Sequence, residues 1–219
     1  MTTTVQDIVD RVEVTLKDVG NVRWPVAEII DAVNDAQGAL LEARPDLFQI
    51  TYTLPLAEGN EQNLPANGYE LLDVMYNIDG DGVVGLPVTK IDFNVLTRQR
   101  RAWTESGADL EVRHWTQDIQ QKTSFFVAPM QPNGTGQKLR IRYAKRPDTV
   151  NSVNDQLDTP DEVINAVYYF CVSRALEKDE KFSGSPQAAR FSQLFAAFIT
   201  ARAEADRQME QVKQANEES

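Results

Sequence analysis

Cysteine and histidine are almost absent from this sequence. Among its 219 residues there is one cysteine, Cys171, and one histidine, His114. A lone cysteine excludes an internal disulfide, and a lone histidine excludes a metal site built from several histidines. Cys171 stands between Phe170 and Val172 in a helical pattern, so we predict a small buried side chain rather than a nucleophile. His114 lies beside Trp115 in a short strand pattern, and we predict a structural role for it.

Long apolar stretches are also missing. No run approaches the roughly 20 apolar residues that a bilayer-spanning helix needs. Met1–Thr4 has neither the basic region nor the apolar run of a signal peptide. The sequence therefore predicts a soluble protein, made in the cytosol, with no membrane partner.

Patterns typical of catalysis or cofactor binding are missing as well. The chain has no G-x-S-x-G turn that would present a nucleophilic serine. Asp79–Gly82 lacks the later Glu of a calcium loop, and Gly134–Lys138 lacks the spacing of a phosphate-binding loop. We predict that both are turns between strands, and that the chain has no catalytic residue, no metal and no cofactor. A hydrolase with an unrecognised site is the least favoured hypothesis.

The charge balance is acidic, with 33 Asp and Glu residues against 22 Lys and Arg residues and a net charge of −11. Such a chain is a poor candidate for nucleic-acid binding, because phosphates are attracted by Lys and Arg. The basic residues gather in two places, which we interpret as a solvated face or as contacts with a neighbouring subunit. Contact with DNA phosphates is the alternative. These residues are Arg98, Arg100, Arg101, Lys138, Arg140 and Arg142.

Helical periodicity marks the first 47 residues. Val5–Val19 places its apolar residues on one face, and Thr4 with Asp7 makes a start like a capping box. A second helix begins at Pro25, a residue favoured in the first turn, and Pro45 ends it.

Two further helices are predicted near the other end. Thr159–Glu162 combines a capping box with proline in the first turn, and a long apolar stripe follows. Ser185 caps the fourth helix, which has apolar residues up to Ile199. From Ala203 onward the apolar face fades, so this tail is either frayed or ordered by a partner.

Between the helical ends, apolar and polar residues alternate with the period of β-strands. We also predict one short helix, Phe93–Arg101, in this region. The predicted strands are Ile50–Leu56, Tyr69–Ile78, Val83–Val88, Glu111–Thr116, Ser124–Ala128 and Lys138–Ala144.

These patterns predict an α+β fold. Its N- and C-terminal helix pairs form a four-helix bundle, and a central antiparallel β-rich insertion and an extended C-terminal tail complete it. The predicted domains are a helix pair in residues 1–47, the insertion in residues 48–158, the second helix pair in residues 159–202 and the tail in residues 203–219.

Four stretches, in this order, resemble the head–tail adaptor proteins of tailed bacteriophages, also called connector or head-completion proteins, of the short-tailed type. They are Val22–Gln37 with Ala43–Asp46; Leu64-Pro65 with Tyr69–Val74; Ser124–Pro129 with Leu139–Ala144; and Thr159–Glu162 with Ser173–Asp179. The resemblance covers nearly the whole chain. One departure is Pro25, which stands where Ser or Thr usually caps the second helix.

The resemblance implies a structural protein, not an enzyme, located in the virion at the portal–tail junction and assembled in the cytoplasm of the bacterial host. Its partners would be a homo-oligomeric ring of twelve subunits, the portal protein, a tail nozzle or tail-tube protein, and genomic DNA that passes through the channel without sequence-specific binding. The C-terminal segment would dock against the portal. The residues that we assign to this docking are Glu204, Arg207, Met209, Val212 and Lys213.

A second hypothesis comes from a different class of protein. The chain would be a monomeric module that binds nucleic acid or protein through the basic strand of residues 138–146. A steep salt dependence of DNA binding would favour it over the ring adaptor.

Overall fold

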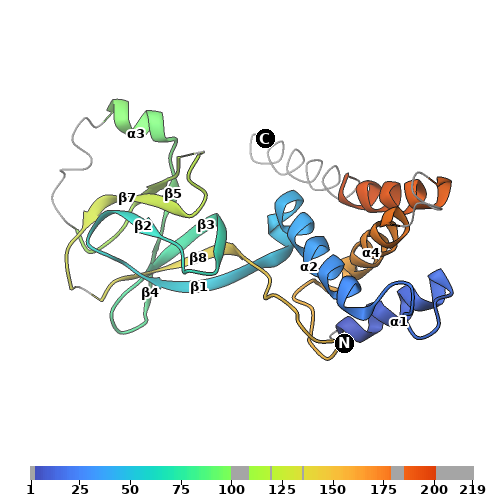
Figure 1. Cartoon of the computed structure of the whole chain (residues 1–219). Helices are drawn as coiled ribbons and strands as arrows, with labels where there is room; N and C mark the ends of the chain where they lie inside the picture. The colour runs from blue at the N-terminus through green and yellow to red at the C-terminus, as the bar shows by residue number, and fades with distance from the viewer. Residues whose placement is uncertain (1–2, 100–108, 119, 135, 179–184, 201–219) are drawn as a thin grey trace. The chain divides into compact units, whose positions relative to one another are not determined.

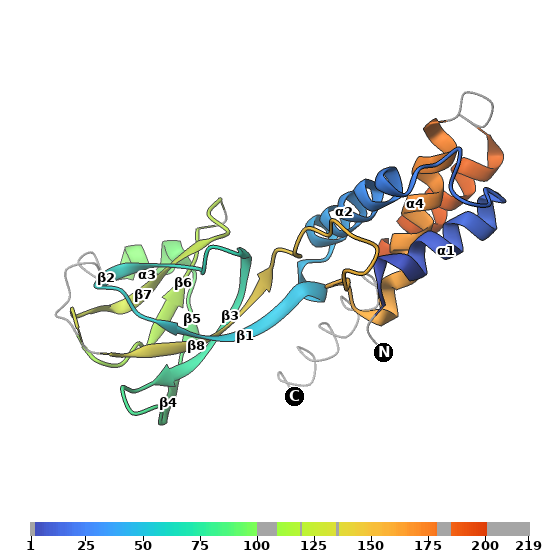
Figure 2. The same cartoon turned by 60° about the horizontal axis from the view of Figure 1, so that its bottom comes forward.

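The computed structural model describes residues 3–99, 109–118, 120–134, 136–178 and 185–200. Contacts divide the chain into two compact units, which Figures 1 and 2 show from two directions. The helical unit consists of Met1–Leu47 and Pro147–Ser219, and the β unit consists of Phe48–Arg146. In the described residues, no helix combines the length and the apolar character that crossing a membrane requires.

Helix α1 (Val5–Leu16) begins as the sequence predicts. The Asp7 backbone N–H donates to the Thr4 hydroxyl, and the Asp7 carboxylate accepts the Thr4 N–H at 2.8 Å. These bonds from the Thr4 backbone and hydroxyl lower the pKa of the Asp7 carboxyl. The helix ends earlier than predicted, because Lys17 has a left-handed backbone with φ of 54°. Val19 therefore lies outside the helix, and its predicted place on the apolar face is wrong.

Helix α2 (Val26–Ala43) follows Pro25, and the short 3-10 helix η1 (Pro45–Phe48) comes after it. The buried face of α2 includes Ile29, Val33 and Leu40, which recur at helical spacing.

Helix α4 (Ile164–Lys178) packs against both N-terminal helices. The Trp24 indole N–H, just before α2, donates to the Ala175 carbonyl at 2.7 Å, and the Thr15 and Tyr168 hydroxyls lie 2.7 Å apart. The guanidinium of Arg11 lies 4.3 Å from the centre of the Tyr168 ring. The C-terminal helical region therefore packs on the N-terminal one, as Figure 2 shows for α1, α2 and α4.

The start of this region differs from the predicted capping box. A 3-10 turn, η2 (Asp161–Val163), precedes α4, and no side chain caps it. The Thr159 hydroxyl instead donates to the Gln37 side-chain oxygen at 3.1 Å, and both residues are buried. A buried glutamine needs a partner, and this contact overrides the local capping preference.

A further helix spans residues 186–200. Phe191 packs against Tyr168 and Tyr169, and the Phe195 and Phe170 ring centres are 5.1 Å apart. This aromatic seam attaches the helix to α4. The predicted tail in residues 203–219 lies outside the described residues.

Residues 147–158 group with the helical unit, although the sequence placed them in the insertion. They contain a single bridge pair, Gln156 with Thr4, and no longer strand or helix. The Val5 and Gln6 N–H groups donate to backbone carbonyls of this segment at 3.0 and 2.8 Å, and the Leu157 N–H donates to the Thr3 carbonyl. Bonding to α1 thus draws these residues to the helices.

The β unit contains two four-stranded sheets. The first sheet has the order β1 (Gln49–Pro55), β8 (Lys138–Lys145), β3 (Gly68–Ile78), β4 (Val84–Pro87). The second has the order β2 (Gly59–Asn63), β7 (Ser124–Gln131), β6 (His114–Thr116), β5 (Thr89–Lys90). Helix α3 (Phe93–Gln99) follows β5, and Arg100 and Arg101, the end of its predicted range, lie outside the described residues.

Two features of these sheets correct the sequence prediction. The β5–β6 pair is parallel, so the insertion is not wholly antiparallel. Strands β2 and β5 were not predicted, because β2 reads GNEQN without apolar alternation and β5 has two residues. The other strands occur where the sequence predicts them, with β4 and β6 shorter than expected.

The core of the β unit lies between the two sheets. Leu139, Ile141 and Tyr143 of β8 point inward, and Trp115 meets Phe125 in an edge-on contact with ring centres 6.5 Å apart. These apolar residues alternate along β8 with polar ones, so period-two alternation places the basic residues on the opposite face.

Candidate interaction surfaces

The predicted basic residues Lys138, Arg140 and Arg142 lie on the outer face of the first sheet. All three are half-buried. The Arg140 guanidinium donates to the Thr53 hydroxyl at 2.7 Å, and Arg142 is paired in register with Asp73 on β3. Polar groups of β1 and β3 therefore lie beside these basic residues, and the Asp73 carboxylate lowers the positive potential near Arg142.

The side chains of the other predicted site residues lie outside the described part of the structure. Arg98 belongs to α3, but its side chain lies outside the described part of the structure. The remaining ones lie outside the described residues: Arg100, Arg101, Glu204, Arg207, Met209, Val212 and Lys213.

A surface that the sequence interpretation missed surrounds the connection between α1 and α2. We call residues 17–25 the α1–α2 turn. Val19 and Val22 in this turn, and Val14 at the end of α1, are 77–84 % exposed, more than the other exposed large apolar side chains of the described residues. A valine side chain has a lower free energy when it is buried than when it is in water. A partner that covers these three valines would therefore gain binding free energy.

Hydrogen bonds hold the α1–α2 turn in one conformation. One Glu13 carboxylate oxygen accepts the Gly20 N–H at 3.0 Å. The Asp18 carboxylate accepts the Arg23 and Trp24 N–H groups at 3.0–3.1 Å. A partner of the exposed valines would therefore bind a preformed surface and pay little ordering entropy.

The sequence contained a weak signal for this turn. Gly20 and Asn21 both have positive φ, which these two residue types tolerate, and valines flank the pair. Gly20-Asn21 indicates the end of the first helix, but the apolar spacing continues through Val19, so the sequence pattern does not show that these valines are exposed.

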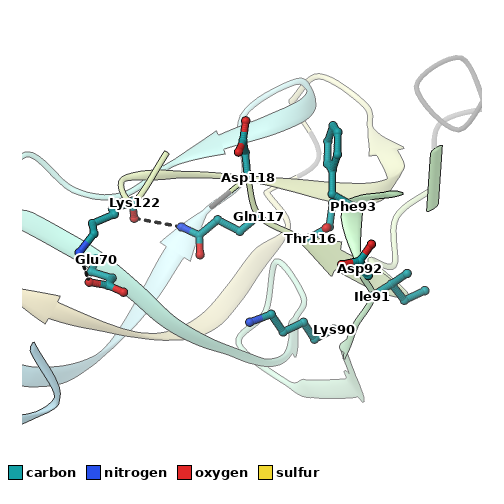
Figure 3. A pocket seen from close by; sticks show the side chains of 9 residues that line it. All are labelled: Glu70, Lys90, Ile91, Asp92, Phe93, Thr116, Gln117, Asp118 and Lys122. Carbon is teal, nitrogen blue, oxygen red and sulfur yellow. Dashed lines mark hydrogen bonds and ion pairs between the residues drawn. The ribbon is translucent and has the colours of Figure 1, made fainter. Parts of the chain in front are cut away.

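The β unit contains a pocket of about 410 Å³, drawn in Figure 3. Its charged groups already interact within the fold. Lys122 Nζ lies 2.9 Å from the Glu70 carboxylate, Lys90 Nζ lies 4.9 Å from the Trp115 ring centre, and the Asp92 carboxylate accepts two N–H groups of α3. The pocket is lined by Glu70, Lys90, Ile91, Asp92, Phe93, Thr116, Gln117, Asp118 and Lys122.

This lining offers no arrangement for nucleophilic catalysis. Thr116, its only hydroxyl residue, is buried, and the Gln117 amide donates to the Lys122 carbonyl at 3.0 Å. Lysines and carboxylates mixed in one pocket suit polar contact with a partner surface better than capture of an ion of one sign.

Cys171 and His114 occupy structural positions. Burial raises the pKa of the Cys171 thiol to about 12, so the reactive thiolate is scarce at neutral pH. His114 is half-buried in β6, paired with Ala128 of β7. Among the described residues, no group of three or more His, Cys, Asp or Glu side chains is placed to hold a metal ion.

Comparison with known protein families gives a match over almost the whole chain. The sequence profile of the SU10 adaptor protein family matches residues 3–215. The chain belongs to this family. It is a phage head–tail adaptor, so the predicted function is confirmed. SU10 adaptors are structural proteins, and the prediction that the chain is not an enzyme is confirmed on this ground.

One solved structure similar to this SU10 adaptor is described as the neck of an empty GTA particle computed with C6 symmetry. The two chains are 16 % identical, and the alignment covers 78 % of this chain and 76 % of that chain with a TM-score of 0.28. A search of curated proteins finds no match.

Proposed function

We propose that this SU10 adaptor forms a ring of twelve copies at the neck of a virion, between the portal protein and the tail, and continues the channel through which genomic DNA passes. The family match over residues 3–215 carries this proposal, because it includes the residues of both units.

Surfaces left open on both units support an assembly role. The helical unit exposes the valines of the α1–α2 turn, and the helix of residues 186–200 leaves Leu194 exposed. The β unit exposes Val84 and Leu86 on β4. Scattered apolar side chains are normal on a monomer, but a group such as the valines of the α1–α2 turn suits burial against a neighbouring subunit.

The finer architecture is part of the proposal. The two helix pairs form a four-helix bundle, with the β unit as its insertion. The segment of residues 203–219 extends to the portal, where Met209 and Val212 supply apolar contacts and Glu204, Arg207 and Lys213 supply polar ones. The β unit receives the tail nozzle or tail-tube protein.

The proposed channel tolerates DNA without holding it. The chain has a net charge of −11, and the described basic residues of β8 have polar or acidic neighbours. A lining with negative potential repels phosphates, so DNA slides past without sequence-specific contacts.

Electron microscopy of the purified chain, alone and with its portal protein, tests the proposal. We expect twelve-fold rings, either free or seated on the portal. A variant ending at residue 202 should fold, as judged by an unchanged unfolding midpoint, but should lose portal binding. A chain that forms no ring and shows no affinity for portal assemblies would refute the proposal.

A further inference from the structure

The two outer edges of the first sheet are open. Strands β1 and β4 are its end strands, and no other strand of the described residues pairs with their outer sides. Val84 and Leu86 on β4 are 62 and 60 % exposed, and Ile50 and Tyr52 on β1 are exposed as well. Each edge thus presents apolar side chains beside backbone that no further strand of the described residues covers, while the Leu86 carbonyl accepts the Asn77 side-chain N–H at 2.9 Å.

The second sheet protects its edges in the usual ways. Its end strand β2 is polar and includes Glu61, and its other end strand, β5, has two residues, one of them Lys90. Charge and shortness discourage pairing with a further strand. Strand β1 reads QITYTLP and β4 reads VGLP, so neither edge of the first sheet has a charged residue.

The direction of the strands identifies a partner for these edges. In the first sheet β1 pairs antiparallel with β8, β8 with β3, and β3 with β4. Strands β1 and β4 therefore run in opposite directions. If β1 of a second copy lies beside β4, the antiparallel alternation continues without a break, so the chain is complementary to itself.

Such a contact joins unlike edges, β4 of one copy and β1 of the next. The pair then keeps one free edge of each kind, β1 on the first copy and β4 on the second, for further neighbours. Head-to-tail contacts of this type generate closed rings when the rotation between copies closes. A contact between like edges would instead stop at a dimer.

Charge at one end of the joined edges is also complementary. In the antiparallel arrangement, the start of β4 lies opposite the end of β1. The turn before β4 includes the exposed carboxylate of Asp81, and the last residue of β1, Pro55, is paired with Lys138 of β8. Opposite charges at this end favour one direction of pairing.

We infer that β4 of one copy pairs with β1 of a second copy, so that the first sheet continues from subunit to subunit. The inference rests on the proposed ring and names a contact within it. Pro55 and Pro87 limit the pairing, because proline has no N–H to donate. Because the start of β4 lies opposite the end of β1, the pairing is then limited to Val84–Leu86 and to Tyr52–Leu54, the residues before Pro55.

Cysteine cross-linking tests the inference. We would make Thr53→Cys on β1 and Val84→Cys on β4, and add a short bismaleimide, which tolerates a small error in register. Native Cys171 is buried and has a pKa of about 12, so it contributes little background. Mixing the two variants should give cross-linked dimers, whereas each alone should not, and the double variant should give a ladder up to the closed ring.

A matched pair on the second sheet serves as the control. Glu61→Cys on β2 with Lys90→Cys on β5 should give no ladder under the same conditions. A ladder from the control pair equal to that from the first sheet would overturn the inference.

Charged substitutions supply an independent readout. Val84→Lys with Leu86→Lys changes exposed side chains, so the unfolding midpoint should stay unchanged. The concentration needed for ring formation should rise by roughly tenfold or more, because the edge then repels pairing. Glu61→Lys on the second sheet should leave this concentration unchanged.

The outcomes separate this inference from the proposed function. The edge contact would be overturned, and the adaptor ring would stand, if the lysine variant formed rings normally and the double cysteine variant gave no ladder. Absence of any ring, alone or on the portal, would refute the proposed function itself. Cross-links that appear only when a tail or portal protein is added, and join β1 or β4 to that protein, would overturn the choice of a second copy.

Discussion

Both units use an asparagine side chain to hold a residue that lies outside the strands and helices. In the helical unit, the Asn34 amide accepts the Val150 N–H at 3.0 Å and donates to the Val150 carbonyl at 2.9 Å. In the β unit, the Asn77 amide makes the same two bonds to Val112, at 2.9 and 2.8 Å, and a third to the Leu86 carbonyl.

The two asparagines differ in depth. Asn77 is buried, whereas Asn34 is half-buried. Water can replace a lost partner only where it can reach, so the same bonds matter more in the β unit. The β unit is therefore expected to depend more on its asparagine, which is buried more deeply and makes one bond more.

The largest expected effect comes from Asn77→Ala. It leaves the buried Val112 N–H and carbonyl without partners, which costs about 2–4 kcal/mol of unfolding free energy. Urea unfolding followed by tryptophan fluorescence measures this, because Trp115 lies in the same core. Exposed Asn94→Ala is the control. A loss below about 1 kcal/mol would show that the comparison fails.

Asn34→Ala should cost less, about 1 kcal/mol, because water reaches the vacated side. Urea unfolding followed by circular dichroism at helical wavelengths reports on the helical unit. Equal losses for Asn34→Ala and Asn77→Ala would contradict the role assigned to depth.

Alkaline pH should weaken the helical unit through Cys171. The folded pKa is raised from 9.0 to about 12, so the thiol stays protonated in the folded chain while the unfolded chain loses its proton. This contribution is fully present below pH 9 and is lost as the pH rises toward 12. Between pH 8 and pH 10 the free energy of unfolding should therefore decrease by about 1 kcal/mol through this group. Cys171→Ala should remove this part of the pH dependence; an unchanged slope would count against the buried thiol.

Val19→Glu with Val22→Glu should change the unfolding free energy by less than about 0.5 kcal/mol, because both side chains are exposed. Assembly onto the neck should nevertheless decrease, as seen by electron microscopy. A large loss of stability would mean that these valines belong to the core. Normal assembly would remove the α1–α2 turn from the interaction surfaces.

The smallest expected effect concerns DNA. Arg140→Glu with Arg142→Glu should leave DNA affinity almost unchanged in fluorescence anisotropy, because a chain with a net charge of −11 is expected to bind DNA weakly. Lys90→Glu with Lys122→Glu changes the charge equally on another surface and is the control. Strong binding that declines steeply with salt and disappears only in the arginine variant would instead favour the nucleic-acid-binding module.

Local signals predicted the elements whose side chains contact their own neighbours. The capping box joins Thr4 and Asp7, three positions apart, and the alternation along β8 places successive residues on opposite faces, so both patterns are visible in the sequence. The same alternation correctly placed Arg140 and Arg142 away from the core. The docking role assigned to Glu204 and its neighbours stays a prediction.

Long-range contacts explain why some sequence-based predictions differ from the structure. Thr159 bonds to Gln37, distant in the chain, in place of capping its helix, and residues 147–158 join the helices through backbone bonds to α1. Strand β2 pairs with β7 although its own residues lack a strand pattern. No local window of sequence contains these partners.

The sequence by itself determined the alternation of helical ends with a β-rich middle, the buried cysteine and the order of motifs that marks an SU10 adaptor. These depend on side-chain chemistry and spacing, which are local. Tertiary structure alone decided the two-sheet arrangement, the rigid α1–α2 turn and the open edges of β1 and β4. An edge exists only once strands are ordered in space, and a valine is exposed only once the rest of the chain has packed elsewhere.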